Sequence, residues 1–156
     1  MITDIITMCR ESGSFLTIED RPDIAKETGM HGVYLSKGYG RPASAIREEL
    51  GAEAVIGVEV SEASSIIALA KADIDYVALD QSTEAEKLAE IIAAAREAGV
   101  NIPIVITGDI TPEDAIVAMA TGASGIATGR PIIEANDPVR ETEEMIRTLE
   151  ESRQAQ

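Results

Sequence analysis

The sequence has little of what several classes of protein need. It contains one cysteine, three tyrosines, one phenylalanine and no tryptophan. With Cys9 alone, no disulfide can form within the chain, and a cysteine zinc cluster is excluded. No apolar run approaches the ~20 residues that span a bilayer, and "MITDIITMCRESG" lacks a basic leader followed by an apolar segment. These absences predict a cytoplasmic protein that does not bind a membrane.

Positive charge is scarce as well. Thirteen lysines and arginines stand against 28 aspartates and glutamates, which gives a net charge of −15. Nucleic acids attract basic surfaces, and single strands also need aromatic side chains on which bases stack. We therefore expect no nucleic-acid partner. An anionic ligand must be held by local backbone groups and a few cations, because the field of the whole protein repels it.

What the sequence does contain is a repeat of strand and helix. Strands are predicted at 14–19, 32–36, 54–60, 75–80, 102–108 and 124–130. Helices are predicted at 3–12, 21–29, 42–51, 61–72, 83–98, 111–122 and from 137 onward. Several strands are nearly continuous apolar runs, which is typical of parallel strands covered on both faces. We predict a single α/β domain over 1–156, built of parallel (β/α) units: a truncated TIM-barrel-like fold of about six strands that starts on a helix.

Several predicted helices carry more specific signals. Thr111 and Asp114 have capping-box spacing around Pro112. Apolar side chains recur at helical spacing in three segments and are expected to face inward. They are Leu88, Ile91, Ile92 and Ala95 in 83–98; Ala63, Ile66, Ile67 and Ala70 in 61–72; and Val139, Thr142, Met145, Ile146 and Leu149 in the last helix. The final "EESRQAQ" is predicted to be a frayed tail.

Two predicted strands end in a glycine-bearing turn that opens a helix: "IPIVITGDITPED" and "GASGIATGRPII". Glycine lets the backbone approach a ligand, and a helix N-terminus adds positive potential. We predict a phosphate site formed by Thr107, Gly108, Asp109, Gly129 and Arg130, in which Arg130 adds a charge-assisted contact. Asp109 repels phosphate unless it turns outward or binds a metal. The alternative is that these glycines only permit tight turns.

Carboxylates form a second group of candidates. Asp20, Glu59, Asp80 and Asp109 lie at or near the carboxyl ends of predicted strands, where such folds place their chemistry. If they converge, they raise one another's pKa or gather a hard cation such as Mg²⁺. We predict Asp20 as a general acid or base, Asp20, Glu59 and Asp80 as metal ligands, and Mg²⁺ as the one cofactor. The alternatives are that Asp20 caps the following helix and that Glu59 pairs with Lys37.

From Phe15 onward the chain resembles thiamin phosphate synthase and its sister, the thiazole tautomerase. "FLTIEDRPDIAKETGMHGVYLSKG" matches the family's order of a strand ending in Asn-Asp, a short helix and a "GADGVHLGQ"-like strand. "IPIVITGDITPEDAIVAMATGASGIATG" resembles the family's "IPVVAIGGIT…AGADGVAV" segment. The resemblance implies an eight-stranded barrel that holds a phosphorylated thiazole at the last two strands, and a synthase that also uses a pyrimidine diphosphate and magnesium.

The resemblance also assigns residues. It puts Asp20 on the aspartate of the Asn-Asp pair, Gly108 and Asp109 on a Gly-Gly phosphate turn, and Gly129 and Arg130 on the last turn. The family's first two units have no counterpart in this sequence, and Glu19 replaces the family's asparagine. The metal aspartate of the family falls near Tyr39, and its strand serine falls on Glu59. "GRPIIEANDPV" is similar to the end of orotidine-phosphate decarboxylase, without that enzyme's catalytic motif.

These departures leave three interpretations open. The first is a family member that binds a small phosphorylated ligand with degraded synthase chemistry; an active enzyme would be of the synthase or tautomerase type. The second is a non-catalytic member that binds a ligand or a partner. The third is a receiver-like phosphoacceptor that uses Asp80, Thr107 and Arg130. An incomplete barrel leaves a strand edge unpaired, so we also predict a homo-oligomer or a partner chain that completes the barrel.

Overall fold

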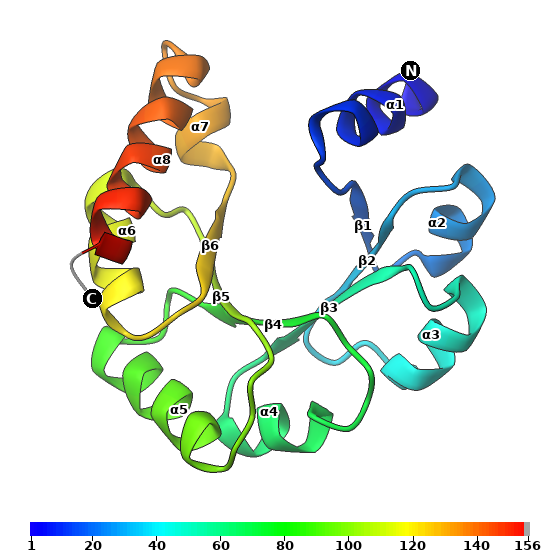
Figure 1. Ribbon diagram of the computed structural model, residues 1–156, viewed down its shortest axis with the longest axis horizontal. Helices are drawn as coiled ribbons and strands as arrows, with labels where there is room; N and C mark the ends of the chain where they lie inside the picture. The colour runs from blue at the N-terminus through cyan, green and yellow to red at the C-terminus, as the bar shows by residue number, and fades with distance from the viewer. Residues whose placement is uncertain (155–156) are drawn as a thin grey trace. The chain divides into compact units, whose positions relative to one another are not determined.

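The protein alternates strand and helix after a first helix, as Figure 1 shows. The computed structural model describes residues 1–154. Within them the strands are β1 Thr17–Glu19, β2 Gly32–Leu35, β3 Val55–Val60, β4 Tyr76–Asp80, β5 Ile104–Gly108 and β6 Gly125–Thr128. The helices are α1 Ile2–Ser12, α2 Pro22–Thr28, α3 Ala43–Leu50, α4 Ala63–Leu69, α5 Ala85–Glu97, α6 Pro112–Ala120, α7 Arg130–Ile133 and α8 Pro138–Gln154. The predicted α/β fold of parallel (β/α) units, truncated relative to a TIM barrel and starting on a helix, is confirmed.

The strands follow one another in the sheet in chain order, β1-β2-β3-β4-β5-β6. Thr17 of β1 lies opposite Gly32 of β2, which in turn lies opposite Val55 of β3, and both pairings are parallel. Val105 of β5 lies opposite Gly125 of β6, again in parallel. The chain divides into two compact units, one of Met1–Glu59 with Ala68–Val77 and one of Val60–Ile67 with the residues from Ala78 onward. A single domain over 1–156 stays a prediction.

The first unit has a core of small and branched side chains. Its buried members come from α2, β2, α3 and β3: Ala25, Val33, Leu35, Ala43, Ile46 and Ile56. Helices α2 and α3 contact each other beside these strands (Figure 1). Gly32 is required here because a Cβ atom at its position would lie 1.8 Å from the carbonyl oxygen of Val55. The close pairing of β2 with β3 therefore has no room for any other residue at position 32.

Arg47 of α3 forms hydrogen bonds to the segments that precede β3 and β4 in the first unit. Its guanidinium donates hydrogen bonds to the carbonyl oxygens of Ala52 (3.1 Å), Ala54 and Asp73 (2.9 Å). Its Nη2 also pairs with Oδ2 of Asp75 at 2.8 Å, and the Arg47 side chain is only 11% exposed. The same Asp75 oxygen accepts the amide of Ile56 at 2.7 Å. One guanidinium thus holds the loop before β3 and the segment before β4 against α3.

In the second unit, the predicted inward face of α5 and the predicted capping box of α6 are confirmed. Leu88, Ile91, Ile92 and Ala95 of α5 are all buried. Thr111 and Asp114 form the capping box of α6, in which the Asp114 amide donates to Thr111 Oγ1 at 3.3 Å and the Thr111 amide donates to Asp114 Oδ2 at 3.2 Å. Helix α8 contacts α6 and α7. No helix of the described residues is long and apolar enough to cross a membrane.

The predicted end of the last strand, 124–130, is wrong. Strand β6 stops at Thr128, and Arg130–Ile133 forms the short helix α7, with Gly129 as its N-cap. Pro131 explains the change, because proline favours the first turn of a helix and cannot donate to a strand ladder.

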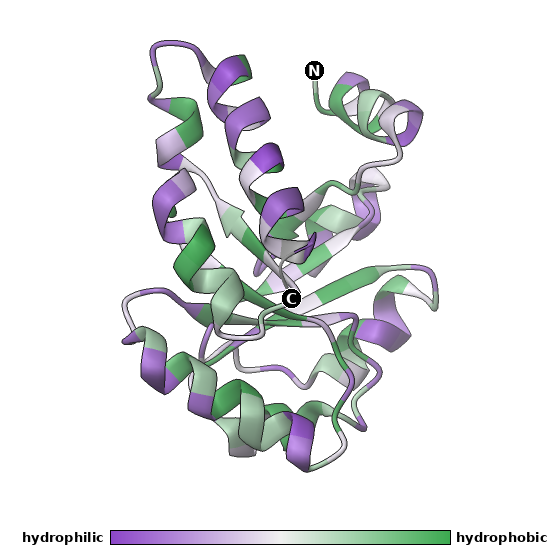
Figure 2. Ribbon diagram, turned by 60° about the vertical axis from the view of Figure 1, so that its left-hand side comes forward, coloured by the Kyte–Doolittle hydropathy of each residue, from purple (hydrophilic) through white to green (hydrophobic). Residues whose placement is uncertain are grey.

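The predicted inward face of the last helix is only partly right. Met145 is buried, whereas Val139 and Ile146 are exposed, and Figure 2 colours most of α8 as hydrophilic. Neighbouring positions on a helix point about 100° apart, so a narrow contact with α6 and α7 covers Met145 and leaves Ile146 in solvent. Ile67 of α4 is likewise exposed beside the buried Ile66. The frayed tail is wrong for 150–154, which continue α8, and its last two residues lie outside the described ones.

Candidate functional site

The first predicted phosphate turn ends β5 at Gly108. Its φ of 148° lies in the region that favours glycine, and a Cβ there would come within 2.4 Å of the Gln81 side chain. Thr107 connects β5 to the end of β4, because its carbonyl oxygen accepts the Gln81 amide at 2.9 Å and its hydroxyl donates to the Leu79 carbonyl at 3.4 Å. Position 108 therefore requires glycine for two reasons: its positive φ and the closeness of the Gln81 side chain.

The second predicted turn lies directly beside the first. Gly129 opens α7, and its carbonyl oxygen accepts the amides of Ile132 and Ile133, both at 3.0 Å. Thr128 donates its hydroxyl to the carbonyl of Ile110 at 2.9 Å, which ties β6 to the residues that follow β5. The structure thus brings together the two turns that the sequence singled out. Pro131 has no amide hydrogen, so Gly129 and Arg130 are the amide donors at the start of α7.

Arg130 and Asp109 form an ion pair that joins the two turns. The Arg130 Nε donates to Asp109 Oδ1 at 3.2 Å, and its Nη2 pairs with the other carboxylate oxygen. The side chains are 70% and 46% exposed. They line an open groove of about 450 Å³ together with Thr111, Pro131, Glu134 and Ala135. Exposed pairs of this kind contribute about 0–1 kcal/mol, so a stronger anion can replace the Asp109 carboxylate at little cost.

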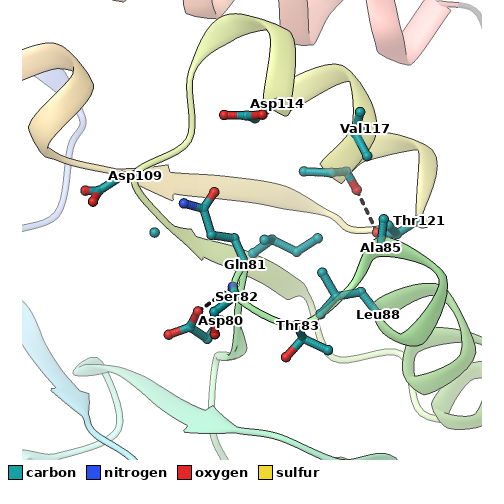
Figure 3. A pocket seen from close by; sticks show the side chains of 13 residues that line it. Asp80, Gln81, Ser82, Thr83, Ala85, Leu88, Asp109, Asp114, Val117 and Thr121 are labelled. Carbon is teal, nitrogen blue, oxygen red and sulfur yellow. Dashed lines mark hydrogen bonds between the residues drawn. The ribbon is translucent and has the colours of Figure 1, made fainter.

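A larger cleft of about 570 Å³ lies at the ends of β4 and β5, next to α5 and α6 (Figure 3). It is lined by Asp80, Gln81, Ser82, Thr83, Ala85, Leu88, Ile106, Gly108, Asp109, Asp114, Val117, Ala118 and Thr121. Most of its polar residues come from the loops after β4 and β5, with Asp80 at the end of β4 and Asp114 in α6, and its apolar side chains come mainly from α5 and α6. Gln81 was not among the predicted site residues, although its place directly after a predicted strand was a signal for it.

Asp80 is held as a carboxylate in this cleft. The Ser82 amide donates to its Oδ1 at 2.6 Å, and this bond, together with a hydrogen bond from the Ser82 side chain, lowers the pKa of Asp80 below its usual value. Partial burial acts in the opposite direction and is the weakest of the three causes. Asp80 therefore remains ionised at neutral pH and is a poor proton donor.

Asp20 connects the ends of β1 and β2 within the first unit. Its Oδ1 accepts the Ser36 amide at 2.8 Å, and its Oδ2 accepts the Ser36 hydroxyl. The residue has a φ of 52°, which is unusual for a residue other than glycine. The alternative that Asp20 caps α2 is wrong, because Arg21 is the N-cap and makes no side-chain capping bond. Its role as a general acid or base stays a prediction.

Glu59 accepts hydrogen bonds from β2 and from the loop that follows it. Its Oε2 accepts the hydroxyl of Tyr34 at 3.2 Å and the backbone amide of Lys37 at 3.4 Å. The contact with Lys37 is thus to its main chain, whereas the alternative had expected its ammonium group. Glu59 also lines a small cavity of about 190 Å³ with Tyr39 and Arg41.

The predicted magnesium ligands Asp20, Glu59 and Asp80 each accept hydrogen bonds from residues near them in their own unit. No three histidine, cysteine, aspartate or glutamate side chains of the described residues gather as a metal ion needs. Asp20 has hydrogen bonds on both carboxylate oxygens, and Glu59 is bonded to Tyr34 and Lys37. Magnesium binding by Asp20, Glu59 and Asp80 stays a prediction.

The fold and the joined turns define a truncated (β/α)-barrel-like protein whose candidate site lies at the carboxyl ends of its strands. Residues 1–132 match the family described as thiamine monophosphate synthase, and the chain belongs to that family. It is 36% identical over 127 residues to the thiamine-phosphate synthase of Nitrosococcus oceani, covering 77% of this chain and 58% of that one. It is 32% identical over 130 residues to that of Chlorobium limicola, covering 79% and 61%. The chain thus spans about three-fifths of the length of these curated relatives.

The comparisons with solved structures agree. Thiamine phosphate pyrophosphorylase from Pyrococcus furiosus superposes with a TM-score of 0.83 at 25% identity, covering 96% of this chain and 74% of that one. Orotidine 5'-phosphate decarboxylase from Pyrococcus horikoshii superposes with a TM-score of 0.71 at 19% identity, covering 95% and 80%, which shows a shared fold. The family resemblance seen in the sequence is confirmed, and the receiver-like alternative has no support.

Proposed function

We propose that this chain binds a small phosphorylated metabolite of the thiazole-phosphate type and takes part in the thiamine-phosphate synthase chemistry of its family. The observation that carries the proposal is the Asp109–Arg130 ion pair, which joins the two glycine turns. The family match runs through both turns, to residue 132. Neither a degraded synthase nor a binding-only protein is supported by that match, so synthase-type chemistry is the activity we propose.

The proposed phosphate lies in the groove between the two turns and replaces the Asp109 carboxylate on Arg130. The carboxylate already occupies the geometry that a phosphate oxygen pair needs, because Arg130 approaches it with two nitrogens. Gly129 and Arg130 stand at the start of α7 and add two backbone amides to the second turn. A hydrogen bond to a charged group contributes about 1.5–3 kcal/mol. This gain exceeds the free energy that is lost when the exposed Asp109–Arg130 pair is broken.

Replacing Arg130 with methionine is expected to weaken phosphate binding about tenfold, because it removes one charge-assisted contact. Asp109→Asn is expected to strengthen binding about threefold, because it removes the competing carboxylate. Calorimetric titration of inorganic phosphate and of thiazole phosphate into each variant measures both effects.

The matched control is Arg140→Met, which removes an equal charge from the exposed α8 side of a neighbouring groove. If Arg130→Met and Arg140→Met weaken phosphate binding equally, only the net charge matters and the proposed site is wrong.

The proposal also includes how the chain assembles and where in the cell it is found. Strands β1 and β6 are the two ends of the sheet, and α1 carries the exposed apolar residues Ile2, Ile5 and Met8. These features support the predicted homo-oligomer or partner chain, and a monomer in light scattering would count against the former. A cytoplasmic location stays part of this proposal.

A further inference from the structure

Gln81 has a polar end without a partner beside the first glycine turn. It follows β4 directly and extends into the cleft, in the view of Figure 3 between Asp109 and Asp114. Its carboxamide makes no hydrogen bond with any residue that the structure describes, and Figure 3 draws none from it to the rest of the cleft. Both a hydrogen-bond donor and an acceptor are therefore available at this position.

The backbone around Gln81 is fixed on both sides. Its own amide donates to the Thr107 carbonyl at 2.9 Å. The Asp80 carboxylate accepts the Ser82 amide at 2.6 Å, and the Asp80 carbonyl accepts the Thr83 amide at 3.2 Å. These three bonds hold the residue at the end of β4. Because this main chain is already ordered, binding a ligand to Gln81 costs the protein little backbone entropy.

The stem of the side chain is positioned as well. A Cβ atom on Gly108 would lie 2.4 Å from Gln81 Cγ and 2.6 Å from its Cδ, so the stem occupies the space that any other residue at position 108 would fill. Gly108 leads directly into Asp109, the partner of Arg130. The free carboxamide consequently lies beside the turn at which the proposed phosphate binds.

We propose that Gln81 is a ligand-contacting residue that donates a hydrogen bond from its amide nitrogen to the phosphorylated ligand at the Gly108 turn. This inference rests on the proposed function and deepens it. The cleft already carries the carboxylates of Asp80, Asp109 and Asp114. A neutral carboxamide adds a donor there without adding charge, whereas a fourth carboxylate would repel an anionic ligand.

The test is a titration of inorganic phosphate and of thiazole phosphate into the full chain and its Gln81 variants. Gln81→Met keeps the stem and removes the donor, and it is expected to weaken binding of the ester about fivefold to tenfold. Gln81→Glu removes the donor and adds a like charge, so binding is expected to fall about a hundredfold. Gln81→Ala, which removes the stem too, is expected to weaken binding at least as much as methionine does.

Ser82→Glu is the matched control. Ser82 is exposed on the same turn and bonds to Asp80 through its backbone amide and its side chain. The variant keeps the backbone bond, loses the side-chain bond and adds the same charge without touching Gly108. Its expected effect is about twofold, mainly from screened repulsion. Thermal unfolding of every variant, followed without ligand, separates loss of binding from loss of fold.

The outcomes separate the inference from the function on which it rests. If Gln81→Met and Gln81→Ala bind as wild type does while Arg130→Met is weakened, the role of Gln81 is overturned and the phosphate site stands. The role is also overturned if Ser82→Glu weakens binding as much as Gln81→Glu. If the wild-type chain binds neither phosphate nor the ester, both proposals are wrong.

Discussion

Replacing Gly32 with alanine is expected to lower the free energy of unfolding by about 3 kcal/mol. The added Cβ would lie 1.8 Å from the Val55 carbonyl oxygen and 2.6 Å from its backbone nitrogen. These are main-chain atoms, so no side chain can rotate away. Strand β2 cannot shift freely either, because Gly32 is paired with Thr17 on one side and with Val55 on the other. A urea titration measures the change as a lower midpoint at an unaltered slope.

Gly40→Ala is the control for this substitution. A Cβ at Gly40 would meet no heavy atom within 4 Å among the described residues, and its backbone needs no positive φ. Its expected effect is within about 0.5 kcal/mol of zero. If the two alanine variants had the same midpoint, the close approach of β2 to β3 would not be a constraint on stability.

Replacing Arg47 with alanine is expected to cost about 3–4 kcal/mol of stability in the same measurement. The side chain is nearly buried, and its removal leaves the carbonyls of Ala54 and Asp73 without their donor. The Asp75 carboxylate loses its cation and keeps only the Ile56 amide. Arg47→Lys is expected to recover less than half of the loss. An ammonium group is a point charge and cannot reach all of these acceptors as the planar guanidinium does.

Arg41→Ala serves as the comparison for Arg47. Arg41 pairs with Glu49 at 2.6 Å on the surface, where water replaces the lost partner. Its unfolding midpoint is expected to stay close to that of wild type. Equal loss in the Arg41 and Arg47 variants would mean that charge, and not the buried network, sets the stability of the first unit.

Much of the fold could be predicted because its signals are local. The buried strand ending at Gly108 and the capped helix after Thr111 each carry their pattern within a dozen residues. Helix α7 was missed because a four-residue helix is too short to show a period, and only Pro131 hinted at it. The exposure of Ile146 depends on which helices contact α8, and no local pattern contains that information.

The candidate site could be predicted only in part for the same reason. The sequence identified Gly108 and Gly129 as neighbouring turns because parallel strands end at one edge of a sheet. It could not show that Asp109 turns toward Arg130, since that pair joins residues 21 positions apart. Nor could it show that Gln81 lies over Gly108, because the contact depends on the register of β4 with β5.

The most direct test of the phosphate site is a titration of the isotope-labelled chain with thiazole phosphate, followed by the nuclear magnetic resonance of its backbone amides and arginine side chains. We predict that the largest shifts occur at the amides of Asp109, Gly129 and Arg130 and at the Arg130 Nε–H, which exchanges a carboxylate for a phosphate oxygen. Shifts centred elsewhere, with the Arg130 Nε–H unmoved at saturation, would show that the two turns do not hold the phosphate.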